Sequence, residues 1–361
     1  MKYIDEYRDK NLVINLAEQI RKESKKEIKL MEVCGGHTMA IQKFGIPALL
    51  PETIKLISGP GCPVCVSDRK FIDQTVAYSR LSNVIIATYG DLIRVPGSSS
   101  SLNEEKAAGK DIRIVYSVLD ALKIAEQNPD KIVVFPGIGF ETTAPASAAG
   151  ILNAEKRGIK NFLVYSSHKI MPPAMAALID EGVNLNGYIA PGHVSTITGT
   201  AIYADIPKKY NLGCVIAGFE PVDLLQSVLM LVKQIESGKP KVEIQYKRVV
   251  KPEGNIIAQG MMNSVFELRP DWWRGLGVLP GSGLGISEKY SAFDAEKQLQ
   301  VEVEPTKEDK GCICGEILKG LKSPKDCKLF ATACSPSDPV GACMVSNEGA
   351  CHAYYKYNRN L

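Results

Sequence analysis

The sequence contains no long apolar run and carries little net charge. Its formal net charge is +3 over 361 residues, and no stretch approaches the ~18 consecutive apolar residues that cross a bilayer. The first ten residues are charged and lack the apolar stretch of a secretory signal. These absences give no reason to expect a nucleic-acid or membrane partner, and they predict a cytoplasmic protein.

Cysteine, by contrast, is abundant, and its ten residues are unevenly placed. Cys34, Cys62 and Cys65 lie early in the chain, Cys214 stands alone, and the remaining cysteines lie within residues 312–351. A reducing cytosol disfavours structural disulfides. Packing as a small apolar side chain is a sufficient explanation for Cys214, but it does not account for the dense group in the tail.

Short runs of β-branched residues alternate with segments whose apolar residues recur at helical spacing. This alternation is typical of α/β proteins with mainly parallel sheets. We therefore expect two similar Rossmann-like parallel α/β domains, followed by a less regular, cysteine-rich C-terminal region. The predicted strands are residues 28–33, 54–57, 84–88, 112–116, 132–135, 162–165, 187–190 and 214–217, and the predicted helices include 69–80, 118–127, 142–156 and 221–237.

The predicted domains are residues 1–110, residues 111–240 and the C-terminal region 241–361. The region of Asp111 and the stretch Gly238-Lys239-Pro240 mark the two boundaries. A strand, then Gly-Phe-Glu, then a helix occurs at residues 139–141 and again at 218–220, which indicates a duplication. Beyond Lys241 glycine and proline become frequent, so regular structure is expected to decrease.

The tail carries cysteines with irregular spacing and no paired CxxC knuckles: Cys312, Cys314, Cys327, Cys334, Cys343 and Cys351. A structural zinc site usually shows such knuckles, and irregular loop thiolates suit a [4Fe–4S] cluster better. Inert packing and disulfides are the metal-free alternatives. Two thiols would remain after a cubane is bound. That pair could form a redox-active disulfide beside the cluster, as in ferredoxin:thioredoxin reductases.

Cys34 ends a predicted strand and is followed by Gly35-Gly36-His37-Thr38. The glycines allow a tight turn with exposed amides. If a helix begins there, its positive end faces Cys34, lowers the pKa of the thiol and favours a reactive thiolate. The alternative is a plain strand-to-helix turn with an inert cysteine and a capping histidine.

Cys62 and Cys65 form a CxxC between a predicted strand and a helix that begins near Ser67. Thiol–disulfide chemistry is the natural interpretation of this spacing. Half of a metal site and simple turn chemistry are the alternatives.

The Gly137-Ile138-Gly139 turn invites a nucleotide-binding interpretation, but the third glycine of GxGxxG is missing. Glu141 would also place a carboxylate where phosphate should bind. We therefore expect Glu141 to cap its helix or to line a cleft. His193 follows Pro191-Gly192 and is either a cleft residue or part of an exposed loop.

Several of these segments together strongly resemble the HypD family of [NiFe]-hydrogenase maturation factors. The resemblance is carried by Cys34-Gly-Gly-His-Thr38, Gly59-Pro-Gly-Cys-Pro-Val-Cys65, Phe135-Pro-Gly-Ile-Gly-Phe-Glu-Thr-Thr-Ala-Pro145, Pro191-Gly-His-Val-Ser195, Gly218-Phe-Glu-Pro221, Asp326-Cys-Lys-Leu-Phe-Ala-Thr-Ala-Cys-Ser-Pro336 and Val340-Gly-Ala-Cys-Met-Val-Ser-Asn-Glu-Gly-Ala-Cys351. These motifs span essentially the whole chain. Ala331 and His352 depart from the family pattern.

The resemblance implies roles for individual residues. The [4Fe–4S] ligands would be Cys312, Cys327, Cys334 and Cys351, with Cys314 the alternate to Cys312. Cys314 and Cys343 would be the redox pair near the cluster. Cys34 would hold the iron under assembly, beside His37, Cys62 and Cys65. Further cleft candidates are Glu141, Thr142, His193 and Glu220.

The resemblance also implies the function. With a HypC-type small chaperone the chain would form the scaffold on which Fe(CN)2CO is assembled, and it would accept cyanide from a HypE-type donor. Cluster and thiols would supply electrons, so the chain would be a scaffold and redox factor rather than a free-standing enzyme. The alternatives are an iron–sulfur thiol–disulfide reductase and a binding module with structural zinc.

Overall fold

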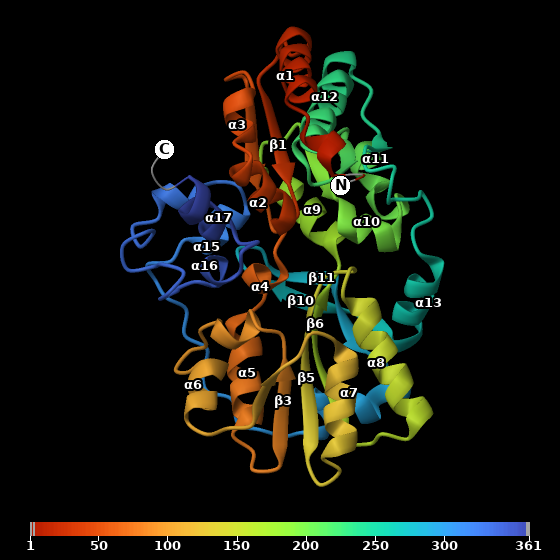
Figure 1. Cartoon of the computed structure of the whole chain (residues 1–361), viewed down its shortest axis with the longest axis vertical. Helices are drawn as coiled ribbons and strands as arrows, with labels where there is room; N and C mark the ends of the chain where they lie inside the picture. The colour runs from red at the N-terminus through yellow and green to blue at the C-terminus, as the bar shows by residue number, and fades with distance from the viewer. Residues whose placement is uncertain (1, 3, 359–361) are drawn as a thin grey trace.

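Two sheets, one in each lobe of the molecule, form the framework of the computed structural model, which describes residues 2 and 4–358 (Figure 1). The upper sheet has the order β2-β1-β7-β8-β9 and the lower sheet the order β10-β11-β6-β5-β3-β4. The strands are β1 (Ile28–Glu32), β2 (Ile54–Ser58), β3 (Val84–Thr88), β4 (Ile112–Ile114), β5 (Ile132–Gly139), β6 (Phe162–Lys169), β7 (Gly187–Pro191), β8 (Gly213–Ala217), β9 (Val242–Ile244), β10 (Phe266–Trp273) and β11 (Gly277–Ile286).

Helices cover both faces of each sheet, so the central strands are buried on both sides. The main helices are α1 (Lys10–Glu23), α2 (Gly35–Lys43), α3 (Ile46–Leu49), α5 (Arg69–Ser79), α6 (Leu102–Ala107), α7 (Val118–Gln127), α8 (Ala144–Arg157), α9 (Met171–Asp180), α10 (Gly192–Thr198), α11 (Asp205–Tyr210), α12 (Pro221–Ser237) and α13 (Ile256–Val265). Residues of α1, α2, α3 and α12 pack on one face of the upper sheet, and residues of α7, α8 and α13 pack on one face of the lower sheet. Every residue of β3 and β6 is buried, which explains the apolar runs Val84–Ala87 and Phe162–Tyr165 at their starts.

The predicted α/β class with parallel Rossmann-like sheets is confirmed. All neighbouring strands of the upper sheet are parallel, as are β3 to β6 in the lower sheet. Each predicted strand and helix is present with shifts of a few residues at its ends. The two Gly-Phe-Glu segments lie at the ends of β5 and β8, which hold different positions in their sheets: β5 pairs with β3, the first strand of the lower sheet, whereas β8 pairs with β7 and not with β1.

The two sheets do not follow the predicted division at residues 110 and 240. Each sheet takes strands from more than one predicted segment, because the chain crosses from the upper to the lower lobe after β2, returns before β7 and crosses again before β10. Asp111 precedes β4 within the lower lobe, and Gly238 lies between α12 and β9 within the upper lobe. Local composition carries no signal for such crossings, because strand partners are chosen by long-range packing.

Regular structure also continues further along the chain than predicted. β10 and β11 form an antiparallel hairpin that pairs with β6 and extends the lower sheet. After α14 (Ala295–Gln298) the described chain continues as short helices joined by loops: α15 (Cys314–Leu318), α16 (Ala342–Val345) and α17 (Ala350–Tyr357). This tail, blue in Figure 1, lies beside the upper lobe, where α17 packs against α2.

No helix within residues 2 and 4–358 combines the length and the apolar character needed to span a membrane.

A buried ion pair fixes the first turn of α12, and its loss should destabilise the protein strongly. The Asp223 side chain is 0% exposed and accepts hydrogen bonds from the Arg248 guanidinium at 2.7 and 2.6 Å. Asp223→Ala would leave this guanidinium without its carboxylate. We expect the free energy of unfolding, measured with urea, to fall by about 3–5 kcal/mol. Asp205→Ala, which breaks the exposed pair with Lys209, is the control and should cause no measurable change.

Candidate functional site

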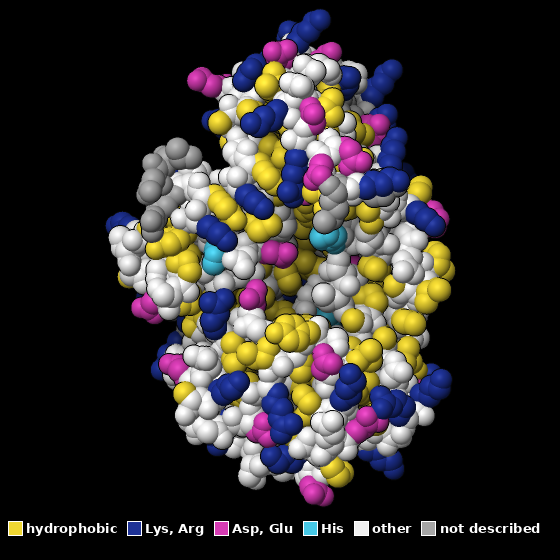
Figure 2. Space-filling model, in the orientation of Figure 1, with side chains coloured by type: hydrophobic (Ala, Val, Ile, Leu, Met, Phe, Trp, Pro, Cys, Tyr) yellow, Lys and Arg dark blue, Asp and Glu magenta, His cyan; other side chains and the backbone are white. Residues whose placement is uncertain are grey.

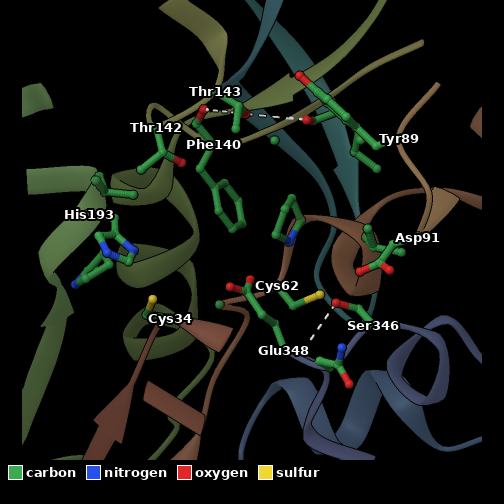
Figure 3. A pocket seen from close by; sticks show the side chains of 18 of the residues that line it. Cys34, Cys62, Tyr89, Asp91, Phe140, Thr142, Thr143, His193, Ser346 and Glu348 are labelled. Carbon is green, nitrogen blue, oxygen red and sulfur yellow. Dashed lines mark hydrogen bonds between the residues drawn. The ribbon is translucent and has the colours of Figure 1, made fainter. Parts of the chain in front are cut away.

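A cavity of about 700 Å³ opens between the two lobes (Figure 2), at the carboxyl ends of strands from both sheets. This is where Rossmann-like sheets bind ligands. Its walls are formed by the turns after β1, β2, β3, β5 and β7 and by tail residues 346–348. Figure 3 shows Cys34 and His193 on one side of the cavity and Asp91 on the other, with Cys62 between them.

Cys34 is the N-cap of α2, which begins at Gly35, and it therefore lies at the positive end of this helix. The backbone N–H groups of His37 and Gly36 at the start of α2 favour the thiolate form of Cys34 and act to lower its pKa. Burial and the carboxylate of Glu348 nevertheless raise the pKa of Cys34 to about 12, with a further contribution from Glu32. The predicted lowering of the pKa is therefore wrong for the chain alone, because two backbone amides do not offset loss of water and nearby carboxylates.

Two carboxyl groups beside Cys34 were not predicted. Glu32 ends β1, and its carboxyl group accepts hydrogen bonds from the Thr38 hydroxyl and, at 3.1 Å, from the Cys34 backbone N–H. Burial raises the pKa of Glu32 to about 8. Glu348 comes from the tail and packs so closely that a Cβ atom at Gly35 would lie 2.5 Å from its backbone oxygen. A lone acid in the apolar run of β1 was a usable signal for Glu32, but nothing local places Glu348 near Cys34.

Phe219 stacks on both histidines of the upper lobe. Its ring centroid lies 4.6 Å from that of His37 and 4.1 Å from that of His193. His37 is fully buried, and its Nε2–H donates to the carbonyl groups of Ala217 and Gly218 at 3.2 and 3.1 Å. Burial lowers the pKa of His37 to about 4. His193 lines the cavity, whereas His37 anchors α2 to the end of β8 behind it.

The CxxC lies at a strand-to-helix turn, as predicted. Cys62 caps the short helix α4 (Pro63–Val66) and lines the cavity, while Cys65 is fully buried. The turn packs directly on the Cys34 turn: the Gly35 N–H donates to the Gly61 carbonyl at 2.9 Å, and a Cβ atom at Gly61 would lie 2.2 Å from the Cys34 nitrogen. Glycine at position 61 therefore allows the turn to approach Cys34.

Sulfur–sulfur contacts connect this CxxC to the tail. The helices α4 and α16 are in contact, which brings the Cys65 thiol near Cys62 and Cys343 and the Cys343 thiol near Cys314. The contacts with Cys314 and Cys65 lower the pKa of Cys343 to about 6, whereas burial raises that of Cys65. We call Cys62, Cys65, Cys343 and Cys314 the thiol chain. It runs from the cavity into the tail.

Five tail cysteines line a second, smaller pocket between loops of the tail: Cys312, Cys314, Cys327, Cys334 and Cys351. Leu329, Phe330 and Met344 supply apolar walls. Cys343 is not among the lining residues, but it lies near Cys314, which is one of them.

The donor set of this pocket fits an iron–sulfur cluster. A Cβ atom at Gly341 would lie 2.8 Å from the Sγ atoms of both Cys312 and Cys314, so glycine leaves room beside the thiols. The Val340 N–H donates to Cys334 Sγ at 3.4 Å, the kind of hydrogen bond that stabilises a ligating thiolate. Across residues 2 and 4–358, no three Cys, His, Asp or Glu side chains are arranged around a single metal ion. A set of donors made only of cysteine thiols is the usual ligand set of an iron–sulfur cluster.

The remaining predicted cleft residues divide into two groups. Thr142 lines the cavity with His193. Glu141 lies behind the wall, where its Oε1 accepts the Met171 N–H at 3.0 Å and caps α9. Glu220 is the N-cap of α12 and pairs with Arg8, on a groove next to the cavity. Its carboxylate therefore does not reach the cavity wall.

Two further residues from the sequence analysis have structural partners. Cys214 is buried in the apolar core, as expected. The His352 Nδ1–H donates to the Met344 carbonyl at 3.0 Å, which joins α17 to α16.

Known proteins are similar to this chain along its whole length. A HypD family model, described as "Hydrogenase formation hypA family", matches residues 11–358. The hydrogenase maturation factor HypD of Azotobacter vinelandii is 48% identical over 369 residues, covering 99% of this chain and 97% of that protein. The corresponding factor of Cupriavidus necator is 46% identical and covers 99% and 98%. A putative hydrogenase expression/formation protein of Methanocaldococcus jannaschii is 46% identical and covers 97% and 98%.

Glu141→Gln should remove part of the pH dependence of folding stability. Burial raises the pKa of Glu141 to about 7, although the bond from Met171 opposes the shift. An unfolded glutamate titrates near ~4.3. The stability that Glu141 contributes is therefore complete below pH ~4.3 and is lost as the pH rises through about 7.

Urea unfolding of both proteins from about pH 4 to about pH 8 measures this effect. The wild type should lose stability relative to Glu141→Gln as the pH increases across this window. A difference in unfolding free energy that does not change with pH would contradict the assignment.

Proposed function

This chain belongs to the HypD family of hydrogenase maturation factors, and we propose that its interlobe cavity is the site where the Fe(CN)2CO group of [NiFe] hydrogenase is assembled. The observation that carries the proposal is the position of Cys34, whose thiol lines a cavity shared with Cys62, His193 and Glu348 (Figure 3). Low-spin iron bearing cyanide and CO accepts a soft thiolate ligand.

The surroundings of Cys34 explain how iron could be selected there. Without metal, burial and the neighbouring Glu348 keep the thiol protonated at neutral pH. A divalent iron ion would reverse that balance, because it attracts carboxylates and displaces protons from the thiol and from carboxyl groups beside it. The backbone N–H groups of Gly36 and His37 favour the thiolate that forms. The site therefore favours a metal-bound thiolate over a free one.

The cavity also suits delivery of ligands by partner proteins. It opens at the surface between the lobes (Figure 2), and Ile138, Phe140 and Val194 give it apolar walls that limit water near the iron. In this proposal a HypC-type chaperone supplies the opposing thiolate, and a HypE-type partner delivers cyanide as a thiocyanate.

His37 contributes by position. It is neutral at pH 7 and holds the first turn of α2 against the Ala217 and Gly218 carbonyls, which keeps the Cys34 turn in place.

The tail would hold a [4Fe–4S] cluster through Cys312, Cys327, Cys334 and Cys351, with Cys314 as the alternate to Cys312. When bound, such a cluster supplies single electrons. Cys314 and Cys343 are in contact, as a redox pair requires, and the thiol chain links this pair to Cys62 and Cys65. Thiol–disulfide exchange along it would bring reducing equivalents to the cavity.

The same contacts support a second candidate function. Cys62 lines an open cavity, so the thiol chain could reduce a disulfide of a partner protein, as in an iron–sulfur thiol–disulfide reductase. The two functions differ at Cys34, because exchange along the thiol chain does not involve that thiol.

Cys34→Ala should abolish hydrogenase maturation and remove the cyanide and CO bands from the infrared spectrum of the anaerobically purified complex with its HypC-type partner. The iron and sulfide of the tail should be retained, because the two sites use separate thiols. Cys214→Ala, a buried cysteine outside both sites, is the matched control and should keep the bands. A full set of bands in Cys34→Ala would sink the assignment of Cys34 and move the iron to another site, such as the Cys62/Cys65 pair.

Single serine substitutions of the proposed cluster ligands should remove most of the bound iron. Cys327→Ser and Cys351→Ser each delete a thiol from the tail pocket, so iron, sulfide and the stability of the tail should be lost together. Cys343→Ser should retain the iron, because Cys343 does not line the pocket. Cys312→Ser compared with Cys314→Ser decides between the two alternate ligands. Normal iron and sulfide in Cys327→Ser and Cys351→Ser would disprove the ligand set.

A further inference from the structure

One buried arginine binds the backbone of the CxxC segment. Arg274 follows β10, and its side chain is only 12% exposed. Its Nε donates to the Cys65 carbonyl at 2.9 Å and its Nη2 to the Ser67 carbonyl at 3.0 Å. Its backbone N–H donates to the Val66 carbonyl at 2.8 Å. Three successive carbonyl groups at the end of α4 are therefore bound by a single residue.

The turn that carries Arg274 also touches the tail. A Cβ atom at Gly275 would lie 2.6 Å from the Gly315 carbonyl oxygen, so the turn packs directly on α15 next to Cys314. The free end of the guanidinium donates to both Glu308 carboxylate oxygens at 3.0 and 2.9 Å. The turn thus lies between the two segments whose cysteines must meet, the CxxC and the tail.

Arg274 also adds charge to this region. The Cys314 and Cys343 sulfurs are close enough to interact electrostatically with the guanidinium. Its contacts with the carbonyl groups of Cys65 and Ser67 fix the position and the rotation of α4. Cys65 belongs to this helix, so its side chain is fixed as well. A planar guanidinium can bind two carbonyl groups and a carboxylate at once, whereas a lysine ammonium cannot reproduce this geometry.

We propose that Arg274 is a positioning residue that holds Cys65 in line with Cys343 for thiol–disulfide exchange. The inference rests on the redox role of the thiol chain given under the proposed function. In the exchange, the Cys343 thiolate attacks Cys65 of a Cys62–Cys65 disulfide, and Cys62 leaves as a thiolate. Cys314 then attacks Cys343, which forms the Cys314–Cys343 disulfide and releases the Cys65 thiolate. Two electrons and two protons move from the tail pair to the CxxC pair, so the step needs no other oxidant or reductant.

The test measures how well the two sulfurs are placed. In the full-length protein with Cys62→Ser and Cys314→Ser, the Cys65–Cys343 disulfide is equilibrated anaerobically against reduced and oxidised glutathione and quantified by mass spectrometry. The equilibrium gives the effective concentration of the Cys65 thiol relative to the Cys343 thiol. Arg274→Gln in this background should lower this effective concentration by about tenfold, the size expected from losing charge-assisted hydrogen bonds. Arg274→Lys should fall between the two.

Arg269→Gln is the matched control. Arg269 lies on the same hairpin and also binds one carboxylate, Glu296, and one carbonyl group, that of Ser166, but it contacts neither cysteine segment. It should leave the effective concentration unchanged. A thermal unfolding curve of each variant separates local positioning from general destabilisation. If Arg274→Gln does not fold, Arg274→Lys carries the comparison.

Two outcomes would overturn the proposal, and they differ in what else they affect. If every folded Arg274 variant has the same effective concentration as the reference protein with Arg274 present, Arg274 does not position Cys65. This result would leave the proposed function intact. Failure of the disulfide to form at all in the reference protein with Arg274 present would remove the thiol chain itself, and with it the redox part of the proposed function. A loss confined to the Arg274 variants supports the proposal.

Discussion

The site depends on close packing between the C-terminal tail and two N-terminal turns. A Cβ atom at Gly35 would overlap the backbone of Glu348, and one at Gly61 would overlap the backbone of Cys34. Within the tail itself, a Cβ atom at Gly349 would lie 2.1 Å from the Cys343 carbonyl oxygen. Backbones approach this closely only where side chains are absent. This contact brings Glu348 beside Cys34 and Cys343 beside Cys65, so the cavity and the thiol chain both require it.

The same packing explains why Cys34 is not simply a reactive thiol. A helix N-terminus lowers the pKa of an exposed cysteine, but here burial and two carboxyl groups have the larger effect and raise it. The arrangement therefore keeps the thiol protonated at neutral pH in the absence of a partner or ligand.

Fold class and most elements could be predicted because they depend on local periodicity. The apolar runs of β3 and β8 and the spacing in α7 and α12 are recovered almost residue for residue. The division into domains could not be predicted, because β7 pairs with β1 although strands β3 to β6 of the lower lobe lie between them in the sequence. No local property of Gly187–Pro191 identifies β1 as its partner. The β10–β11 hairpin was missed for a similar reason, since its glycine and proline residues obscure its strand pattern.

The sequence by itself determined which chemical groups are available: a thiol after β1, a CxxC after β2 and a dense set of cysteines in the tail. Residue type and spacing are sufficient for this, because thiol chemistry is a property of the side chain and its nearest neighbours. Only the tertiary structure decided that Cys65 touches Cys343, that Glu348 faces Cys34 and that Arg274 lies between the CxxC and the tail. These relations join segments separated by hundreds of residues, and they arise from the packing of the whole chain around two sheets.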